Sequence, residues 1–133
     1  MLIPHLHFRG DCEKAIALYQ RAFNTQTDEI VRHSDYDPEN YAGDRRISHA
    51  SMKIHGQTVF LNDNDDMFSG GGVSHSFPVH LIVYFQKAEE LLACYDILKD
   101  DTATDSPFAK TDYSQLVGNF KDKFGMLWGF MVS

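Results

Sequence analysis

The sequence predicts an α+β fold made of two copies of one β-α-β-β-β module. Residues 4–22 and 80–98 share the same order of a short extended run and an amphipathic helix, at an offset of 76 residues. Further segments with strand-like composition follow each helix. The spacing of apolar residues along the two helices is weak evidence for a repeat, because any two amphipathic helices share it in some register. The matched strands before and after each helix are the stronger evidence. Strands that outnumber the helices are typical of the α+β class.

The first module begins with the extended run 4–8 and continues with a helix over 12–22. The helix is predicted because apolar residues recur at spacings of 3, 1, 3 and 3, which lays one stripe along it. The stripe consists of Cys12, Ala15, Ile16, Tyr19 and Ala22. Asp11 directly precedes this segment and is expected to be its N-cap.

Three strands are expected after the first helix, at 28–33, 47–55 and 57–62. Gly56 separates the last two strands, which predicts a tight hairpin at that point. The polar segment 34–46 is expected to form a loop.

The second module repeats this order, with an extended run at 80–84 and a helix over 88–98. The apolar stripe of that helix has the same spacing and consists of Ala88, Leu91, Leu92, Tyr95 and Leu98. Strands are expected near 102–104 and at 115–120 and 126–132, with a turn at Gly125. The Gly-rich segment 64–77 is expected to link module 1–63 to module 78–133 within one fused domain.

Composition and charge exclude several classes of protein. Hydrophobic residues make up 43% of the chain and charged residues 23%, which is ordinary for a globular protein. Twelve basic and nineteen acidic residues give a net charge of −7, which argues against nonspecific binding to nucleic acid or an anionic membrane. Neither a signal peptide nor a membrane-spanning apolar run is recognisable. We therefore expect a cytoplasmic protein without nucleic-acid or membrane partners.

The chain has two cysteines, Cys12 and Cys94, and both fall in predicted helices. Neither belongs to a CxxC motif or to a zinc-type spacing. We expect two unlinked, buried thiols in a reducing compartment, with a disulfide between them as the alternative.

Three stretches of sequence carry a resemblance to a known family. They are 4–15 (PHLHFRGDCEKA), 47–56 (ISHASMKIHG) and 122–128 (DKFGMLW). Together they resemble the PhnB-like branch of the vicinal oxygen chelate superfamily, which includes glyoxalases, ring-cleaving dioxygenases and bleomycin resistance proteins. The resemblance implies a curved mixed sheet around a cleft, with the helices on the outer face. The branch carries a historical methyltransferase label, but the sequence lacks the Gly-rich nucleotide-binding turn expected of such an activity.

The resemblance also implies where a metal ion would bind. Metal-dependent members hold a divalent ion with one residue from the first and last strand of each module. The corresponding positions here are Pro4, Phe60, His80 and Gly129. A catalytic site for a divalent ion needs about three protein ligands and only His80 has a donor atom, so we expect no metal and no other cofactor. Whether His5, His7 and His49 form a non-standard metal site is left open.

We expect the protein to bind a small molecule by stacking and burial in an aromatic pocket. The expected lining residues are Phe8, His80, Tyr84, Tyr113 and Trp128. Simple core packing is the alternative for Phe8 and Trp128. The alternative function is a lyase, isomerase or dioxygenase that uses a metal or His80 as base. A third candidate is a structural or interaction role. A homodimer is expected because a chain of this size leaves strand edges to be covered. The sequence does not identify the ligand.

Overall fold

The computed structural model describes residues 1–67 and 79–133. The chain divides into two compact units, Met1–Phe77 and Pro78–Ser133. Most of the segment expected as a Gly-rich linker, from residue 68 onward, lies outside the described residues.

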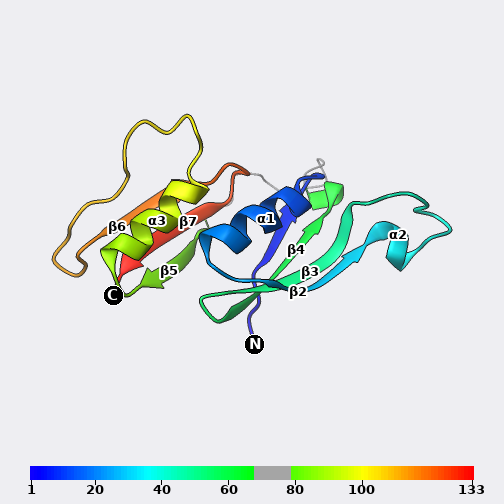
Figure 1. Ribbon diagram of the computed structural model, residues 1–133, viewed down its shortest axis with the longest axis horizontal. Helices are drawn as coiled ribbons and strands as arrows, with labels where there is room; N and C mark the ends of the chain where they lie inside the picture. The colour runs from blue at the N-terminus through cyan, green and yellow to red at the C-terminus, as the bar shows by residue number, and fades with distance from the viewer. Residues whose placement is uncertain (68–78) are drawn as a thin grey trace. The chain divides into compact units, whose positions relative to one another are not determined.

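The first unit is a four-stranded mixed sheet with one long helix (Figure 1). Its elements in chain order are β1 (His5–Phe8), α1 (Cys12–Ala22), β2 (Thr27–Arg32), α2 (His33–Tyr36), β3 (Ile47–Ile54), β4 (Gln57–Asp63) and the 3-10 helix η1 (Asp65–Met67). The strand order is β1-β4-β3-β2. β1 runs parallel to β4, whereas β3 is antiparallel to both β4 and β2. The short helix α2 falls in the segment that was expected to be a loop.

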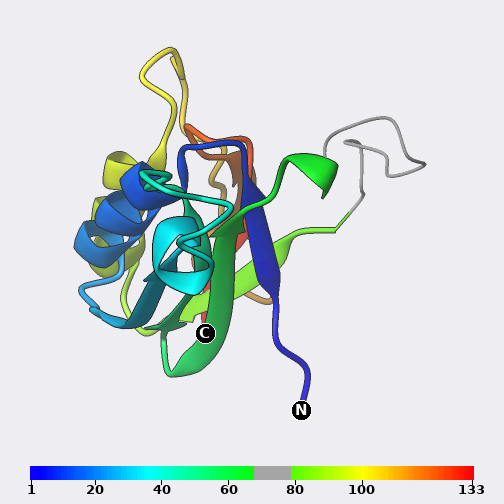
Figure 2. The same cartoon turned by 90° about the vertical axis from the view of Figure 1, so that its right-hand side faces the viewer.

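α1 covers one face of this sheet, as Figure 2 shows. Four of the five residues of its predicted stripe are buried, and Leu18 joins them, whereas Ala22 is half-buried. The strands alternate accordingly: Leu6 and Phe8 of β1 are buried, and His5 and His7 lie on the opposite face. The helix-free face of the first sheet is therefore the one that carries polar residues of β1.

The carboxylate of Asp63, and not that of Asp11, caps the first turn of α1. Asp11 occupies the N-cap position, but its side chain makes no capping hydrogen bond. Asp63 lies at the end of β4 and is only 4% exposed. Its Oδ1 accepts hydrogen bonds from the backbone N–H groups of Gly10 (2.7 Å) and Cys12 (3.1 Å), and its Oδ2 accepts one from Ile47 (2.9 Å). One buried carboxylate thus joins the start of α1 to β3 and β4.

A two-residue turn joins β3 to β4, as expected. Ile54 pairs with Gln57, and the two residues between them, His55 and Gly56, have φ values of 48° and 82°. Positive φ at both central residues defines a type I′ turn, whose twist matches that of the flanking strands.

The second unit is a three-stranded mixed sheet with one helix. Its elements are β5 (Leu81–Phe85), α3 (Ala88–Leu98), β6 (Val117–Lys121) and β7 (Leu127–Val132). The strand order is β5-β7-β6, with β5 parallel and β6 antiparallel to β7. The whole chain is thus an α+β protein with two mixed sheets, in agreement with the predicted fold class.

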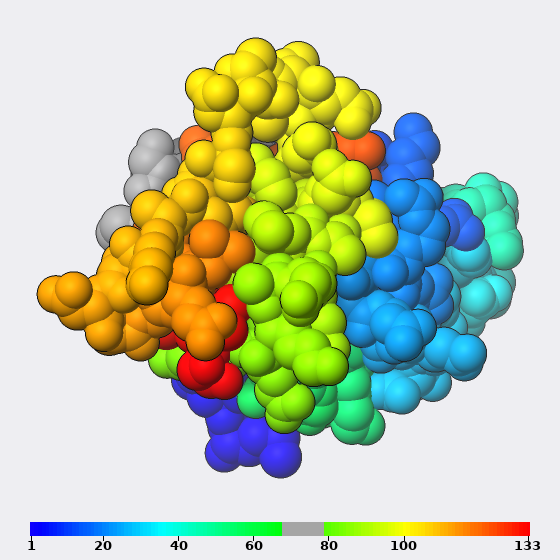
Figure 3. Space-filling model, turned by 60° about the vertical axis from the view of Figure 1, so that its left-hand side comes forward, coloured from blue at the N-terminus to red at the C-terminus, as the bar shows by residue number. Residues whose placement is uncertain are grey.

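The prediction of a strand near 102–104 is wrong. Both Oγ1 and the backbone N–H of Thr102 donate to the carboxylate of Asp100, and the N–H of Ala103 donates to the carbonyl of Asp100. These bonds close a turn, because the Asp side chain competes with ladder pairing for the backbone donors. The segment then runs over the surface beside α3 (Figure 3), and its backbone pairs with the sheet at an isolated bridge between Ala109 and Val117.

Phe108 occupies the place beside β6 where a further strand was expected. Its ring lies against Gly118 so closely that a Cβ on that glycine would be 2.7 Å from the ring. The ring also contacts Tyr95 of α3, Phe120 of β6 and Phe130 of β7. An aromatic cluster therefore closes this side of the second unit, with backbone pairing limited to the bridge at Ala109.

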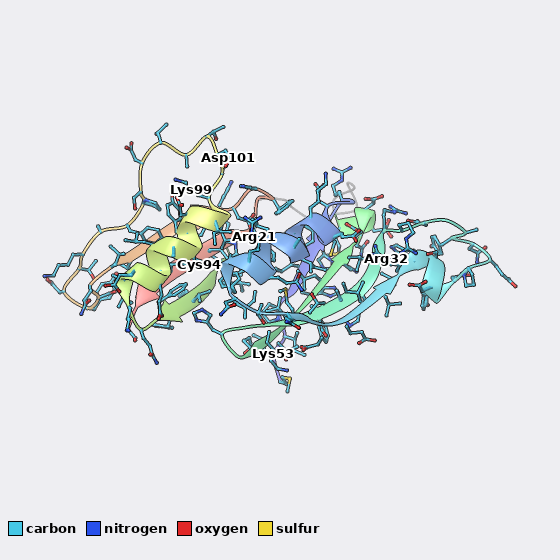
Figure 4. The ribbon with its side chains drawn as sticks, in the orientation of Figure 1. Arg21, Arg32, Lys53, Cys94, Lys99 and Asp101 are labelled. Carbon is cyan, nitrogen blue, oxygen red and sulfur yellow. The ribbon has the colours of Figure 1, made fainter. Side chains whose placement is uncertain are left out.

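The buried stripe of α3 consists of Leu91, Cys94, Tyr95 and Leu98. Leu92 was expected on this stripe, but it is 43% exposed. The helix is turned so that positions 91, 94, 95 and 98 face the sheet, a spacing of 3, 1 and 3 that leaves position 92 at the margin. Cys94, labelled on α3 in Figure 4, and Cys12 are both buried and free, which confirms the prediction of unlinked thiols.

None of the helices in the described ranges combines the length and the apolar character that a bilayer crossing requires.

Candidate ligand-binding site

The helix-free face of the second sheet carries polar side chains next to exposed apolar ones. Val83 and Phe85 of β5 are buried on the α3 side, whereas Ile82 and Tyr84 point the other way and are 53% and 57% exposed. Ile82 pairs with Gly129, and Gly129 pairs with Asn119. These three residues therefore form one row across β5, β7 and β6.

Gly129 leaves open the space that two polar side chains occupy. A Cβ on this glycine would lie 2.9 Å from Oδ1 of Asn119 and 3.2 Å from Nε2 of His80. His80 comes just before β5, two residues from Ile82, and so belongs to the same face. An imidazole and a carboxamide oxygen thus meet over the bare backbone of β7.

This arrangement supplies hydrogen-bonding groups for a polar ligand. Imidazole offers one donor and one acceptor in its neutral form, and the amide of Asn119 offers both. Ile82 and Tyr84 border these groups with exposed apolar and aromatic surface. A few convergent polar groups within apolar surroundings are typical of small-molecule sites.

The structure places two of the predicted residues, His80 and Tyr84, on this face, together with Asn119, which sequence reasoning did not name. The sequence offered one signal: Asn119 is a polar residue between Gly118 and Phe120 within a predicted strand. Its relation to His80 depends on the pairing of β6 with β7, which the sequence alone does not give.

The other three predicted pocket residues lie elsewhere. Phe8 is 3% exposed in the core of the first unit, where its ring contacts Tyr19 of α1. Trp128 is 1% exposed on the α3 side of the second sheet. Tyr113 is 72% exposed on a loop before β6. That loop and Ser133 line an open depression of about 270 Å³.

The pairing registers correct the predicted equivalence of Pro4 and His80. His5 pairs with Phe60, and Ile82 pairs with Gly129. Phe60 and Gly129 were matched as equivalent, so His5 is equivalent to Ile82. The residue of the first unit that is equivalent to His80 is therefore Ile3, one residue before Pro4. The shift arises because three residues separate β1 from α1 but only two separate β5 from α3.

The corrected register does not add a metal ligand, because Ile3 has no donor atom. Across the described ranges, no group of three or more His, Cys, Asp or Glu side chains is placed to hold a metal ion. Thus neither the family-type positions nor the trio of His5, His7 and His49 forms such a group within the described part of the chain.

Comparison with known proteins identifies the family. The family model described as 3-demethylubiquinone-9 3-methyltransferase matches residues 1–131. The chain belongs to this family. It is the PhnB-like family that the resemblance had indicated.

Relatives of this PhnB-like chain extend over nearly its whole length. The protein YjdN of Escherichia coli is 28% identical over 138 residues, which cover 96% of this chain and 91% of YjdN. The solved structure of protein PA1353 from Pseudomonas aeruginosa has a TM-score of 0.82 at 20% identity, covering 100% of this chain and 97% of that one. A structure from Bacillus cereus, titled as a putative 3-demethylubiquinone-9 3-methyltransferase, PhnB protein, has a TM-score of 0.78 at 22% identity, with coverage of 99% and 98%. At these identities the structures show a shared fold.

The stretch of this PhnB-like chain that most specifically resembles the family has a structural role. Asp122 begins it and is 3% exposed. Its Oδ1 accepts hydrogen bonds from the N–H groups of Phe124 and Met126, and its Oδ2 accepts one from the indole of Trp128. The motif therefore fixes the turn between β6 and β7, at Gly125 with φ of 85°, and the indole of Trp128 is engaged within the core.

Proposed function

We propose that this PhnB-like protein binds a small planar molecule with polar substituents on the helix-free face of its second sheet. The observation that carries the proposal is the meeting of His80 and Asn119 over Gly129. The two side chains would hydrogen-bond the polar edge of the ligand, and Tyr84 with Ile82 would cover its flat face. Contacts of Phe8, Tyr113 and Trp128 with the ligand stay predictions.

We do not extend the proposal to the methyltransferase activity in the family's description. The junction between β1 and α1 is the strand-to-helix turn of the first unit, where a nucleotide-type cofactor would be sought. Here the N–H groups of Gly10 and Cys12 donate to the carboxylate of Asp63. Because these donors are engaged by a buried anion, they are not available to a cofactor.

We also propose that binding does not use the metal site of the superfamily. Pro4, Phe60 and Gly129, and Ile3 in the corrected register, offer no donor atoms, which leaves His80 as a single ligand. One imidazole does not make up the three protein ligands that a catalytic divalent ion needs. Ligand binding should therefore be unaffected by prior treatment with EDTA.

The test is a ligand screen on the full chain with planar aromatic acids and phenols as probes. A probe that binds the native state raises the melting temperature, and two-dimensional NMR then locates it. We expect shifts of the amides of Ile82, Asn119 and Gly129. His80→Ala and Asn119→Ala should each weaken binding about tenfold, the effect expected when a hydrogen bond of about 1.4 kcal/mol is lost.

Two further variants sharpen this test. Gly129→Ala should abolish binding while the fold persists, because its Cβ would displace both polar side chains. His55→Asn is the matched control, since it removes a histidine from the first unit at a turn position that Asn tolerates. Probes that shift resonances elsewhere, or that bind His80→Ala as well as the native chain, would contradict the proposal.

A homodimer is the second part of the proposal. β5 is an edge strand of its sheet, and its outward residues Ile82 and Tyr84 are more than half exposed. An exposed apolar edge strand favours association with another copy. Sedimentation at micromolar concentration should show a dimer, and a clean monomer would contradict this part alone. The cytoplasmic location stays a prediction.

A further inference from the structure

The helix-free face of the first sheet holds a histidine pair that the proposed function does not use. His5 and His7 are two residues apart on β1, so both side chains lie on the face opposite the buried Leu6 and Phe8. Their ring centroids are 4.3 Å apart, with an angle of 36° between the ring planes. A metal–imidazole bond is about 2.0–2.1 Å long, so one ion between the two rings could reach a nitrogen of each.

Asn62 fixes which nitrogen of His7 is free. Nδ1 of His7 and Oδ1 of Asn62, on the neighbouring strand β4, are 2.7 Å apart. Because an amide oxygen only accepts, Nδ1 carries the proton and Nε2 keeps its lone pair. Metal-binding histidines are typically held in this way, by an acceptor on the nitrogen that does not bind the metal.

Two acidic residues of β2 lie beside side chains of β3 in this sheet. Nε2 of His49 is 4.0 Å from the carboxylate of Glu29, and Lys53 pairs with Asp28 at 3.7 Å. Glu29 thus places a negative charge beside His49.

The ring of Phe60 lies between His49 and the pair of His5 and His7. Phe60 lies on β4, between β1 and β3, and its ring makes edge contacts with His5 (6.0 Å) and with His49 (4.8 Å). His49 is thereby separated from the pair by an aromatic ring. This agrees with the finding that no group of three such ligands occurs among the described residues.

We propose that His5 and His7 form a two-histidine chelate for an imidazole-preferring divalent ion, Cu²⁺ or Ni²⁺, with Asn62 as the residue that orients His7. Copper stands at the top of the affinity order for such ligands, and nickel follows it. With two protein ligands and a shell completed by water, binding is reversible and the ion is removed by EDTA. The site is distinct from the four family-type positions and independent of the ligand site at His80.

The first experiment titrates EDTA-treated full chain with CuSO₄ or NiCl₂ by calorimetry at pH 7.5. We expect one saturable site per chain. His5→Ala and His7→Ala should each weaken it at least tenfold, because either change leaves a single imidazole. His80→Ala and His55→Asn are the controls and should bind as the native chain does. Binding should disappear near pH 5, where protons compete for the imidazoles.

The second experiment tests whether Asn62 orients His7 for metal binding or whether any two adjacent surface histidines would bind the ion equally well. Asn62→Ala should weaken the ion about tenfold, the lower end of the effect known for such orienting residues. Asn62→Asp should retain or increase the affinity, since a carboxylate also accepts the Nδ1 proton. Circular dichroism confirms that each variant is folded. Equal affinity in the native chain and both histidine variants, or a loss confined to His80→Ala, would overturn the proposal.

Discussion

The indole N–H of Trp128 donates a 2.9 Å hydrogen bond to Oδ2 of Asp122, and both side chains are buried. Oδ1 of the same carboxylate accepts two backbone N–H groups of the turn between β6 and β7. The family-like motif at 122–128 is thus a hydrogen-bonded unit that places β7 against β6. Since Gly129 follows directly, this unit also positions the site at His80.

Asp122→Asn should destabilise the protein by about 1–3 kcal/mol, because the new amide sets one donor against another at the indole. Urea denaturation measures the loss. A double-mutant cycle with Trp128→Phe should give a coupling of about 0.5–3 kcal/mol, as expected for residues in direct contact. Asp101→Asn is the control: its carboxylate is 88% exposed beside Lys123, and the change should stay within about 0.5 kcal/mol. Equal effects of Asp122→Asn and Asp101→Asn would contradict the assigned role.

Asp63→Asn should destabilise the protein by a similar amount, about 1–3 kcal/mol. The reason is that one oxygen holds the start of α1 and the other holds Ile47, so an amide satisfies only one side. Asp65→Asn is the matched control two residues away, on a side chain that is 57% exposed. Hydrogen exchange should show faster opening of the first turn of α1 in Asp63→Asn. Unchanged protection there would argue against the capping role.

Asp44 should titrate at unusually low pH. The side-chain hydrogen bond from Arg46, together with its backbone N–H, lowers the pKa of Asp44 to about 2. The pKa in the unfolded chain is about 3.9, so folding favours the charged form. The contribution to stability is complete above about pH 4 and is lost as the pH falls toward 2. In an NMR titration of the carboxyl carbon, Arg46→Gln should raise the pKa toward 3.9, whereas Arg45→Gln should leave it low.

Both thiols should react slowly with a disulfide reagent in the native protein at pH 8. Burial raises the pKa of Cys94 to about 12 and raises that of Cys12 as well, with a further contribution from Asp63. Since the thiolate is the reacting species, labelling has to wait for local or global unfolding. The rate should rise sharply in urea. An immediate reaction of both cysteines without denaturant would contradict their burial on the inner faces of α1 and α3.

The sequence by itself determined the two long helices, most of the strands and one hairpin. α1 and α3 begin and end where the apolar spacing placed them, because a 3.6-residue period is a local property of the chain. The turn at Gly56 was equally local, since it needs a residue that tolerates positive φ. The fold class and the family followed from the order of these elements and from short motifs.

Tertiary structure decided what the side chains of these elements do. Asp63 instead of Asp11 caps α1, Phe108 on Gly118 replaces a strand, and one residue fewer before α3 matches His80 with Ile3 instead of Pro4. Each outcome depends on contacts between residues far apart in the chain, which period and propensity do not specify. The same is true of the meeting of His80 with Asn119, because a one-residue change in the pairing of β6 with β7 would turn that amide to the other face.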